Sequence, residues 1–411
     1  MRILPVDGLE GDPAAPADVL PEHPPRVETL MPKPFDGYGP SWTCGSIVSG
    51  MARFGAPCRV TATRVTRRIE GLALRAALPA AFNSAPYRYV RRFAERRAER
   101  VFLRDVGPGD IAYIWQNTSL ETTEALARRG ALVVLECINT HQRHARNILD
   151  AEFDRIGLPP SHGITERSAR ELDQKLATAH AVFAPSRAVE ISLLEAGLPE
   201  EKVLPASYGA WMDAVEAPAP RGRRPVFIFV ASVSVRKGAH LLLRAWRRAG
   251  LDAELRVLGA VSDDIARSCA DALAASNVKV MGFRRDVSAQ LAQADVFVLP
   301  SLEEGDPIAT YEAAFHGLPI IASPMGGGRM GDDPERLRLV DPRDEDAMVA
   351  ILRELAGSEE LRRHLGAKAR RAAARFEWPL VGARRVESLM RLHGARVAGA
   401  QDGPARGGAA A

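Results

Sequence analysis

The chain has 411 residues and a net charge of +4, and its length predicts two or three domains. Its 46% hydrophobic and 26% charged residues are typical of a globular protein and exclude a disordered or fibrous chain. The longest apolar runs have the length of strands, which argues against a membrane-spanning helix. The four cysteines lack the spacing of a zinc site or a disulfide framework, so we expect a cytoplasmic protein in a reducing compartment.

The N-terminal half shows an alternation of strands and helices. Residues 1–25, rich in proline, alanine and aspartate, are predicted to be disordered. Short apolar runs then alternate with helical patterns, of which 120–130 and 166–180 are the clearest. The predicted strands of this half are 26–31, 56–65, 110–115, 131–138 and 181–186.

The C-terminal half repeats this alternation after a proline-rich and charged stretch at 213–225, which we interpret as a linker. Helices are expected at 237–250, 262–276 and 345–357. The predicted strands are 225–232, 254–259, 278–283, 295–301, 318–323 and 337–341.

Two such series predict an α/β protein with two Rossmann-like, doubly wound domains that face a central cleft. We place the N-terminal domain at 26–212 and the C-terminal domain at 226–376. A helix at 377–393 could cross back to the N-terminal domain, and 394–411 is predicted to be a disordered tail. Ligands of such sheets bind beyond the carboxyl ends of the strands, so the cleft is the expected site.

A pair of glutamates, Glu304 and Glu312, stands eight residues apart in an otherwise apolar, small-residue stretch. Glu304 is expected in the loop after the strand 295–301. Glu312 is expected in the next helix, predicted at 308–316 and ended by Gly317. The pair could simply be solvated acids near a helix N-terminus, where they are stabilising.

The start of this helix also predicts an anion site, because its first backbone N–H groups have no partner within the helix. The residues concerned are Gly305, Asp306, Pro307 and Ile308. Amides for a phosphate, with carboxylates on either side for hydroxyl groups, are what a nucleotide sugar requires.

The segment GDPIATYEAAFHGLPIIAS, with FVASVSVRKGAHLLLRAW upstream, resembles the retaining glycosyltransferases of GT-B fold, family 4, also called glycosyl transferases group 1. The resemblance covers most of residues 26–393 and is most specific in the C-terminal half. It implies transfer of a hexose from a nucleotide-diphosphate sugar to a carbohydrate or lipid-linked acceptor in polysaccharide or glycoconjugate synthesis. It implies no metal, no other cofactor and no nucleic-acid partner.

The resemblance also implies roles for particular residues. Glu304 would contact the sugar hydroxyls of the donor, and Glu312 the ribose hydroxyls. Lys237 would lie on the diphosphate, where its charge would stabilise the leaving group. The family usually has an arginine some five residues before this lysine, where the chain has Ser232; Arg236 could supply the missing charge.

Two loops of the N-terminal half supply further candidates. Gly39 and Ser41 follow the first strand and could approach a donor phosphate, although glycine loops at this place are common. His141 follows the strand 131–138, and the resemblance implies that a histidine near this point approaches the sugar. His144 competes for this role, and either could be an ordinary surface histidine.

A block of arginines marks the segment 53–104, which contains thirteen arginines and three acids. Within it, residues 87–100 predict a helix with Tyr87, Val90 and Phe93 spaced three apart. An aromatic edge flanked by cations would suit an anionic membrane surface that carries a lipid-linked acceptor. A solvated helix whose apolar edge packs on the sheet explains the pattern equally well.

Two other classes of function fit the same sequence. Ser232 in the usual arginine position would suit a binding protein that kept the fold and lost catalysis, whereas the presence of Glu304, Lys237 and Glu312 argues against that reading. A sugar-nucleotide epimerase would share the donor site but would transfer no sugar to an acceptor.

Overall fold

The computed structural model describes residue 13 and residues 15–82, 85–212 and 224–401. The chain divides into two compact units. The first unit comprises Met1–Glu136, Lys175–Val182 and Pro379–Ala411, and the second comprises Cys137–Gln174 and Phe183–Trp378. Eleven of the thirteen residues of the predicted linker, 213–223, lie outside the described residues.

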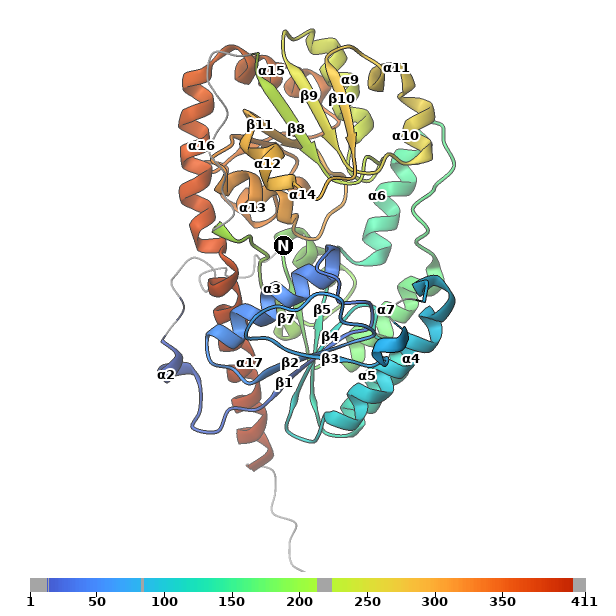
Figure 1. The fold of residues 1–411 in the computed structure, drawn as a ribbon, viewed down its shortest axis with the longest axis vertical. Helices are drawn as coiled ribbons and strands as arrows, with labels where there is room; N and C mark the ends of the chain where they lie inside the picture. Colours follow the sequence, from blue (N-terminus) through green and yellow to red (C-terminus); the bar gives the residue numbers. More distant parts are fainter. Residues whose placement is uncertain (1–12, 14, 83–84, 213–223, 402–411) are drawn as a thin grey trace, which may run out of the picture. The chain divides into compact units, whose positions relative to one another are not determined.

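The first sheet has seven strands in the order β3-β2-β1-β4-β5-β6-β7 (Figure 1). The central β1 pairs in parallel with β2 and β4, so that Val27 has Cys58 and Ile111 as its partners. Every residue of β1, β4 and β5 is buried, as strands covered on both faces require. The strands are β1 Val27–Met31, β2 Cys58–Ala62, β3 Ala73–Ala76, β4 Ile111–Trp115, β5 Leu132–Glu136, β6 Ala181–Ala184 and β7 Val203–Pro205.

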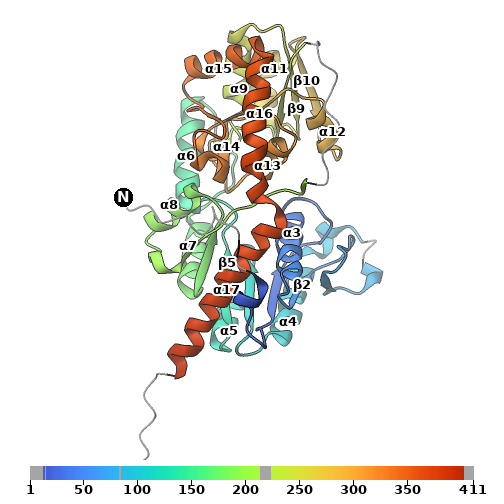
Figure 2. The same cartoon turned by 90° about the vertical axis from the view of Figure 1, so that its left-hand side faces the viewer.

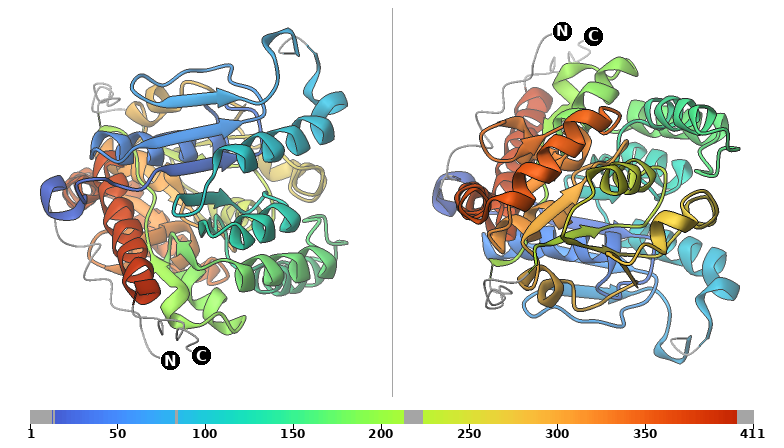
Figure 3. Two further views of the ribbon diagram at one scale, coloured as in Figure 1. Left: turned by 90° about the horizontal axis from the view of Figure 1, so that it is seen from below. Right: turned by 90° about the horizontal axis from the view of Figure 1, so that it is seen from above.

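The C-terminal helix α17 (Trp378–Gln401) packs in the first unit against α3 (Gly39–Arg53). Figure 3 shows α17, in red, beside α3, in blue. A Cβ atom at Gly382 would lie 2.3 Å from the carbonyl carbon of Gly50, so the approach requires glycine. The buried guanidinium of Arg385 bonds to the buried carboxylate of Glu136 at 2.9 Å, which ties the helix to β5.

Other helices of the first unit cover the sheet. α4 packs on β1 and β2, and α5 packs on β5. Their bounds, with that of a short N-terminal helix, are α2 Pro16–Val19, α4 Tyr87–Asp105 and α5 Leu120–Arg128.

Two boundaries differ from the sequence prediction. The one-turn helix α2 lies within the segment 1–25 that we predicted to be disordered, and Pro16 at its first position favours a helix start. Gly394 was the predicted start of a disordered tail, but α17 continues through it to Gln401. The alanine-rich sequence after Gly394 supports that extension, since alanine is the best helix former.

The second sheet has six strands in the order β10-β9-β8-β11-β12-β13, and all of its pairings are parallel. Both sheets therefore begin with the strand order 3-2-1-4-5-6 that characterises the Rossmann fold, which confirms the predicted pair of doubly wound units. The strands are β8 Val226–Val230, β9 Glu254–Leu258, β10 Val278–Gly282, β11 Val296–Leu299, β12 Ile320–Ala322 and β13 Arg338–Leu339.

Helices lie on both faces of this second sheet. α9 is on one face, where it packs with α15, and α12 is on the other (Figures 1 and 2). No helix within the described ranges is long and apolar enough to cross a membrane. The helices of the second unit are α6 Gln142–Arg155, α8 Arg187–Glu195, α9 Ala239–Ala249, α10 Asp263–Ser268, α11 Ala270–Leu273, α12 Val287–Ala292, α13 Ile308–Phe315, α14 Pro324–Gly327, α15 Glu345–Gly357 and α16 Glu359–Ala373. α7, Glu166–Thr178, begins in the second unit and ends in the first.

Candidate functional site

The candidate site of the second unit is built around the loop that joins β11 to α13. The loop is buried from Ser301 to Pro307, and α13 then runs from Ile308 to Phe315 with Gly317 beyond it at φ +71°. A Cβ atom at Gly305 would lie 1.8 Å from the carbonyl oxygen of Ile138. Only glycine permits this contact, which presses the loop against the segment that follows β5.

Lys237 and Glu304 form a buried ion pair at the centre of this site. Lys237 lies in the turn before α9, and its Nζ donates to Glu304 Oε1. Burial raises the pKa of Glu304, but the neighbouring Lys237 and Arg236 outweigh burial and hold that pKa below its usual value. Burial lowers the pKa of Lys237, and Glu304 offsets only part of this effect. The carboxylate is therefore ionised and close to two cations.

Arg236 is held by groups that the sequence did not single out. Its Nε donates to Glu303, and its Nη2 donates to Asn139 Oδ1 at 2.9 Å. Glu303 also accepts from the backbone N–H and the hydroxyl of Thr140, at 3.2 and 2.7 Å. Glu303 is almost fully buried, so it connects Arg236 to the segment after β5 without contact with solvent.

Glu303 therefore pairs with Arg236, whereas Glu304 pairs with Lys237 and lies 3.7 Å from Arg236. The only sequence signal for Glu303 was its place beside Glu304. By contrast Ser232, in the usual arginine position, is exposed, and its hydroxyl lies 3.5 Å from that of Ser234.

The side-chain carboxyl group of Glu312 has no hydrogen bond or ion pair with any residue that the structure describes, whereas its backbone carbonyl accepts from the N–H of His316. It lies in the second turn of α13, and burial raises the pKa of its carboxyl group to about 7. Glu312 is only partly exposed, and a carboxyl group that is largely removed from water without a partner is unfavourable. The group is therefore available to a ligand that carries hydroxyl groups.

Asp306 turns away from the predicted anion site. Its carboxylate accepts from the backbone N–H groups of Tyr208 and Arg329, at 2.5 and 3.1 Å, and from the hydroxyl of Tyr311. Burial raises its pKa to about 7, although these hydrogen bonds oppose the rise. A Cβ atom at Gly328 would lie 2.0 Å from Asp306 Oδ1, which shows how closely the carboxylate is enclosed. Its side chain therefore holds the loop in place.

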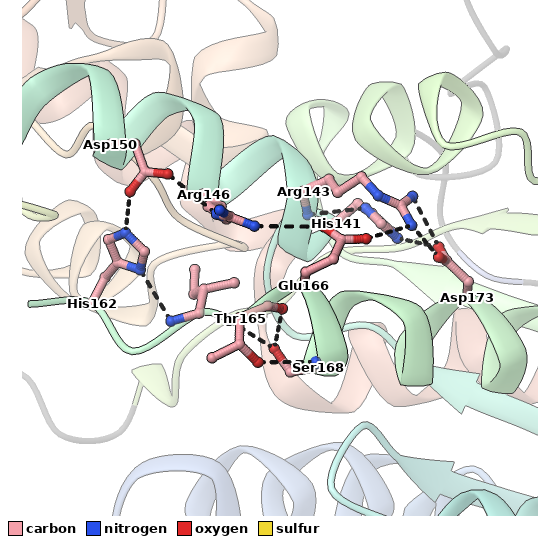
Figure 4. Close-up of polar contacts among 10 residues, drawn as sticks. His141, Arg143, Arg146, Asp150, His162, Thr165, Glu166, Ser168 and Asp173 are labelled. Atoms are coloured by element: carbon pink, nitrogen blue, oxygen red, sulfur yellow. Dashed lines mark hydrogen bonds and ion pairs between the residues drawn. The ribbon is translucent and has the colours of Figure 1, made fainter. Parts of the chain in front are cut away.

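His141 is buried at the N-cap of α6 and both of its ring nitrogens are occupied (Figure 4). Nδ1 accepts from the backbone N–H of Arg143 at 3.2 Å, so the neutral ring donates from Nε2 to Asp173 at 2.9 Å. Burial lowers the pKa of His141, and Asp173 only partly offsets this effect. His144 lies nearer the surface and contacts Glu195 at 3.2 Å.

Gly39 and Ser41 belong to the first unit, whereas all the other predicted site residues belong to the second. The Ser41 hydroxyl donates to Asp36 and accepts from the backbone N–H of Gly37, so it closes its own loop. Gly39 begins α3 with φ +50° and has open space on the side where a Cβ atom would stand. There is therefore room for a ligand beside Gly39. The Ser41 hydroxyl, by contrast, is already hydrogen-bonded within its own loop.

Taken together, the second unit provides a buried lysine, a partly exposed arginine, an ionised carboxylate and an unpaired carboxyl group at the carboxyl ends of parallel strands. Within the described ranges, no group of three or more histidine, cysteine, aspartate or glutamate side chains could hold a metal ion. Cations that are desolvated at the start of α9, where the helix dipole disfavours them, suit an anionic ligand.

Comparison with solved structures defines the class of fold. Sucrose-phosphate synthase from Thermosynechococcus elongatus superposes with a TM-score of 0.69 at 15% identity, covering 90% of this chain and all of that chain. WaaG, a glycosyltransferase involved in lipopolysaccharide biosynthesis, gives a TM-score of 0.62 at 16% identity, over 88% and 99% of the two chains. Anabaena HepE, solved with UDP and glucose, gives 0.64 at 16% identity, over 88% and 98%. The predicted GT-B fold is confirmed.

Sequence comparison then identifies the family of one segment of the second unit. Residues 224–358 match the family model described as glycosyl transferases group 1, which confirms the predicted family for this segment. The chain is 40% identical over 104 residues to an MMP α-(1→4)-mannosyltransferase of Mycolicibacterium hassiacum, over 25% of each chain. It is 30% identical over 168 residues to a D-inositol 3-phosphate glycosyltransferase of Xylanimonas cellulosilytica, over 38% of this chain and 39% of that protein. The chain therefore spans between a quarter and two-fifths of these relatives.

Proposed function

We propose that the protein is a retaining glycosyltransferase that moves a hexose from a nucleotide-diphosphate sugar to an acceptor hydroxyl. The observation that carries this proposal is the buried Lys237–Glu304 pair with Arg236 beside it, inside the segment that matches glycosyl transferases group 1. The chemistry needs cations on a leaving diphosphate and a carboxylate on the sugar, and this group supplies all three charges at one point.

This function gives each candidate site residue of the second unit a particular role. Lys237 offsets the charge that grows on the leaving diphosphate, and Arg236 takes the part of the arginine usual in the family. Glu304 accepts hydroxyls of the sugar, and Glu312 accepts the ribose hydroxyls. The first amides of α13, at Ile308 and the residue after it, bind a phosphate oxygen.

Donor binding must rearrange the resting ion pairs. Lys237 exchanges part of its contact with Glu304 for the diphosphate, and the freed carboxylate turns to the sugar. Glu303 keeps its contacts with Arg236 and Thr140 and acts as a positioning residue. We retain Gly39 as a further donor contact through its backbone, because its surroundings are open, and assign the Ser41 side chain to the loop itself.

The transfer step needs no enzyme nucleophile. The acceptor oxygen bonds to the anomeric carbon on the face from which the diphosphate oxygen leaves, and the acceptor proton passes to that oxygen. The protein contributes orientation and electrostatic stabilisation. His141 orients the segment after β5 through its N-cap contact and does not itself handle the proton, since its ring nitrogens are already paired.

The acceptor is a carbohydrate or a lipid-linked carbohydrate, and we propose that the protein works in the cytoplasm at an anionic membrane surface. The predicted aromatic edge of α4 is not one exposed edge, because the Tyr87 hydroxyl is buried. Exposed Tyr89 and Phe93 lie instead on a face with arginines, which could rest on the lipid headgroups. The arginines on that face are Arg92, Arg96 and Arg100.

Co-sedimentation tests this membrane contact. The parent should bind vesicles containing anionic lipid at low salt, and replacement of the three arginines by glutamine should release it. Arg68→Gln, an exposed arginine outside α4, is the control. A parent that stays in the supernatant would point to a soluble acceptor.

One assay separates the proposed transferase from the other two classes. A panel of nucleotide-diphosphate hexoses, with UDP-hexoses first because HepE was solved with UDP and glucose, is incubated with the protein with and without acceptor sugars. A transferase releases nucleoside diphosphate and forms a glycoside with the anomeric configuration of the donor. An epimerase converts the donor to another nucleotide sugar without acceptor, and an inactive binding protein binds the donor but changes nothing.

A further inference from the structure

Arg64 in the first unit is a buried cation that forms no ion pair with the acids of the described ranges. Only 5% of the residue is exposed, and it lies just beyond the carboxyl end of β2. Its Nη1 donates to the carbonyl oxygen of Ala85 at 2.8 Å, and its guanidinium lies 5.4 Å from the centre of the Tyr87 ring. No carboxylate among the described residues forms an ion pair with it. Because removing a charge from water is unfavourable, buried charges are usually paired with an opposite charge.

The nitrogens that lack a partner are Nε and Nη2, and both are fully buried. Their N–H groups lie on one edge of the guanidinium and form the fork that binds both oxygens of a carboxylate or two oxygens of a phosphate. Elsewhere in the chain this same pair of nitrogens grips a single carboxylate, as in Arg26 with Asp110 and Arg59 with Glu28. In Arg64 this pair of nitrogens has no hydrogen-bond partner among the residues that the structure describes.

Other polar groups gather around this fork. The buried hydroxyls of Thr63 and Tyr87 have no hydrogen bond of good geometry within the described part of the chain. Burial raises the pKa of Tyr87, and Thr63, Arg64 and Arg91 oppose this rise while Glu95 adds to it. These hydroxyls can donate to an oxyanion held by the fork.

The charge around the fork favours an anion. Lys33 and Arg91 both act on Glu95 and partly offset the rise that burial causes in its pKa. Arg92 also opposes the rise and Glu99 adds to it, so with Arg64 the group contains four cations and two acids and carries a net positive charge. It lies at the carboxyl ends of β1 and β2, the edge at which doubly wound sheets bind ligands.

We propose that Arg64 binds an oxyanion of the acceptor, a phosphate or a carboxylate, through its Nε and Nη2, with the hydroxyls of Thr63 and Tyr87 as further donors. The acceptor substrate is therefore an anionic carbohydrate. This assignment rests on the proposed transferase function for its meaning, but the anion site itself can be tested without turnover.

Binding of inorganic phosphate is the first test. Nucleoside diphosphate is added at saturation to occupy the donor site, and phosphate or acetate is then titrated while the melting temperature is followed. The parent should be stabilised in a saturable manner, and Arg64→Gln should not. Arg64→Lys keeps the charge but loses the fork, and should bind on the order of tenfold more weakly. The exposed Arg68→Gln serves as the matched control and should behave as the parent.

Stability without anion distinguishes a ligand-binding arginine from a structural one. Arg64→Met removes the unpaired charge and fills similar space, so it should melt no lower than the parent when no phosphate is present. A marked loss of stability in Arg64→Met, with unchanged phosphate binding in Arg64→Gln, would overturn the proposal. Arg64 would then be a structural residue that holds Ala85 in place through its hydrogen bond.

Acceptor preference is the second test. A hexoside, its phosphate ester and the matching uronide are compared as acceptors, so that phosphate and carboxylate sources are told apart. The parent should favour one of the charged acceptors, and Arg64→Gln should lose that preference by on the order of 10- to 100-fold in kcat/KM. Donor hydrolysis without acceptor should not change. Equal use of all three acceptors by the parent would refute an anionic acceptor, whereas absence of any donor turnover would instead count against the transferase itself.

Discussion

The cations at the candidate sites of the two units differ in whether an acid is paired with them. In the second unit Lys237 faces Glu304 and Arg236 faces Glu303, whereas Arg64 in the first unit faces no acid within the described residues. A paired charge can remain buried in the absence of ligand, but a ligand must then compete with the internal partner. An unpaired charge binds its ligand without that competition. The ligand-free protein is less stable, because the buried charge has no partner. In the ligand-free protein, the cations of the donor site are therefore neutralised by glutamates, whereas we expect the charge of Arg64 to be neutralised only when an anion binds.

The largest effect is expected from the loss of the paired carboxylate. Glu304→Gln should lower transfer by about 10²–10³-fold, because the sugar loses a charged contact. It should also lower the free energy of unfolding by about 3 kcal/mol, since Lys237 is left unpaired. The double variant Lys237→Met with Glu304→Gln should regain that stability while remaining inactive. Urea unfolding and a transfer assay measure these effects, and no recovery in the double variant would mean that the pair does not form.

Gly305→Ala should be the next most damaging change to the donor side. The added Cβ atom would lie 1.8 Å from the carbonyl oxygen of Ile138, so the loop that carries Glu304 must move. A misplaced loop should reduce transfer by about 10²-fold and lower stability by about 1–3 kcal/mol. Gly357→Ala, where an added Cβ atom meets nothing within 4 Å, should leave both unchanged. If the two variants behave alike, the close contact at Gly305 has no role.

Glu303→Gln tests whether an internal partner positions a cation of the donor site. The variant should reduce kcat by about tenfold with little change in KM, because Arg236 loses the nearer of its two carboxylates but stays in the site beside Glu304. Combining it with Arg236→Ala should cost little more than Arg236→Ala alone, since the two act as one unit. Additive losses would show that Glu303 acts independently of Arg236.

Glu312 should make the stability of the protein depend on pH, because its pKa in the folded state is about 7, above the ordinary value of 4.5. The folded state keeps this proton between those values, so stability should fall as pH rises from about 5 to 7 and level off above. Glu312→Gln should flatten part of that slope, and Asp306, with its own pKa of about 7, accounts for a further part.

The same carboxyl group should govern nucleotide affinity. If its ionised form accepts ribose hydroxyls, calorimetry should show that nucleoside diphosphate binds more tightly as pH rises through 7. Glu312→Gln should weaken binding by about 1–3 kcal/mol and retain only the dependence that comes from the phosphate itself. Identical affinities and pH profiles in parent and variant would exclude the ribose contact.

The smallest effect is expected at His141. His141→Asn keeps a side chain that can cap α6, so stability should change by about 1 kcal/mol or less and transfer by no more than a few-fold. His141→Ala should lose more stability than His141→Asn. A loss of transfer by orders of magnitude in His141→Asn, without a loss of stability, would restore the histidine as a group that touches the sugar.

Much of the fold was readable from the sequence. The predicted strands of each half correspond to observed ones, because continuous apolar runs of four to six residues have few other ways to be buried. β3 and β7 were missed. β3 carries Arg75 at the edge of its sheet and is partly exposed, and β7 has only three residues, so neither has the apolar pattern of a buried strand.

The sequence by itself determined where the chemistry of the donor site lies: at the carboxyl ends of β8 and β11, with Lys237, Glu304 and Glu312 on the elements that begin there. The spacing of residues along a loop and a helix is local, so a pattern can reveal it. Which side chains are paired was decided only by the tertiary structure, because partners such as Glu303 and Thr140 are 163 positions apart in the chain. Arg64 is one of thirteen arginines in its segment, and only folding shows that it is buried with an open fork, since burial depends on every element packed around it.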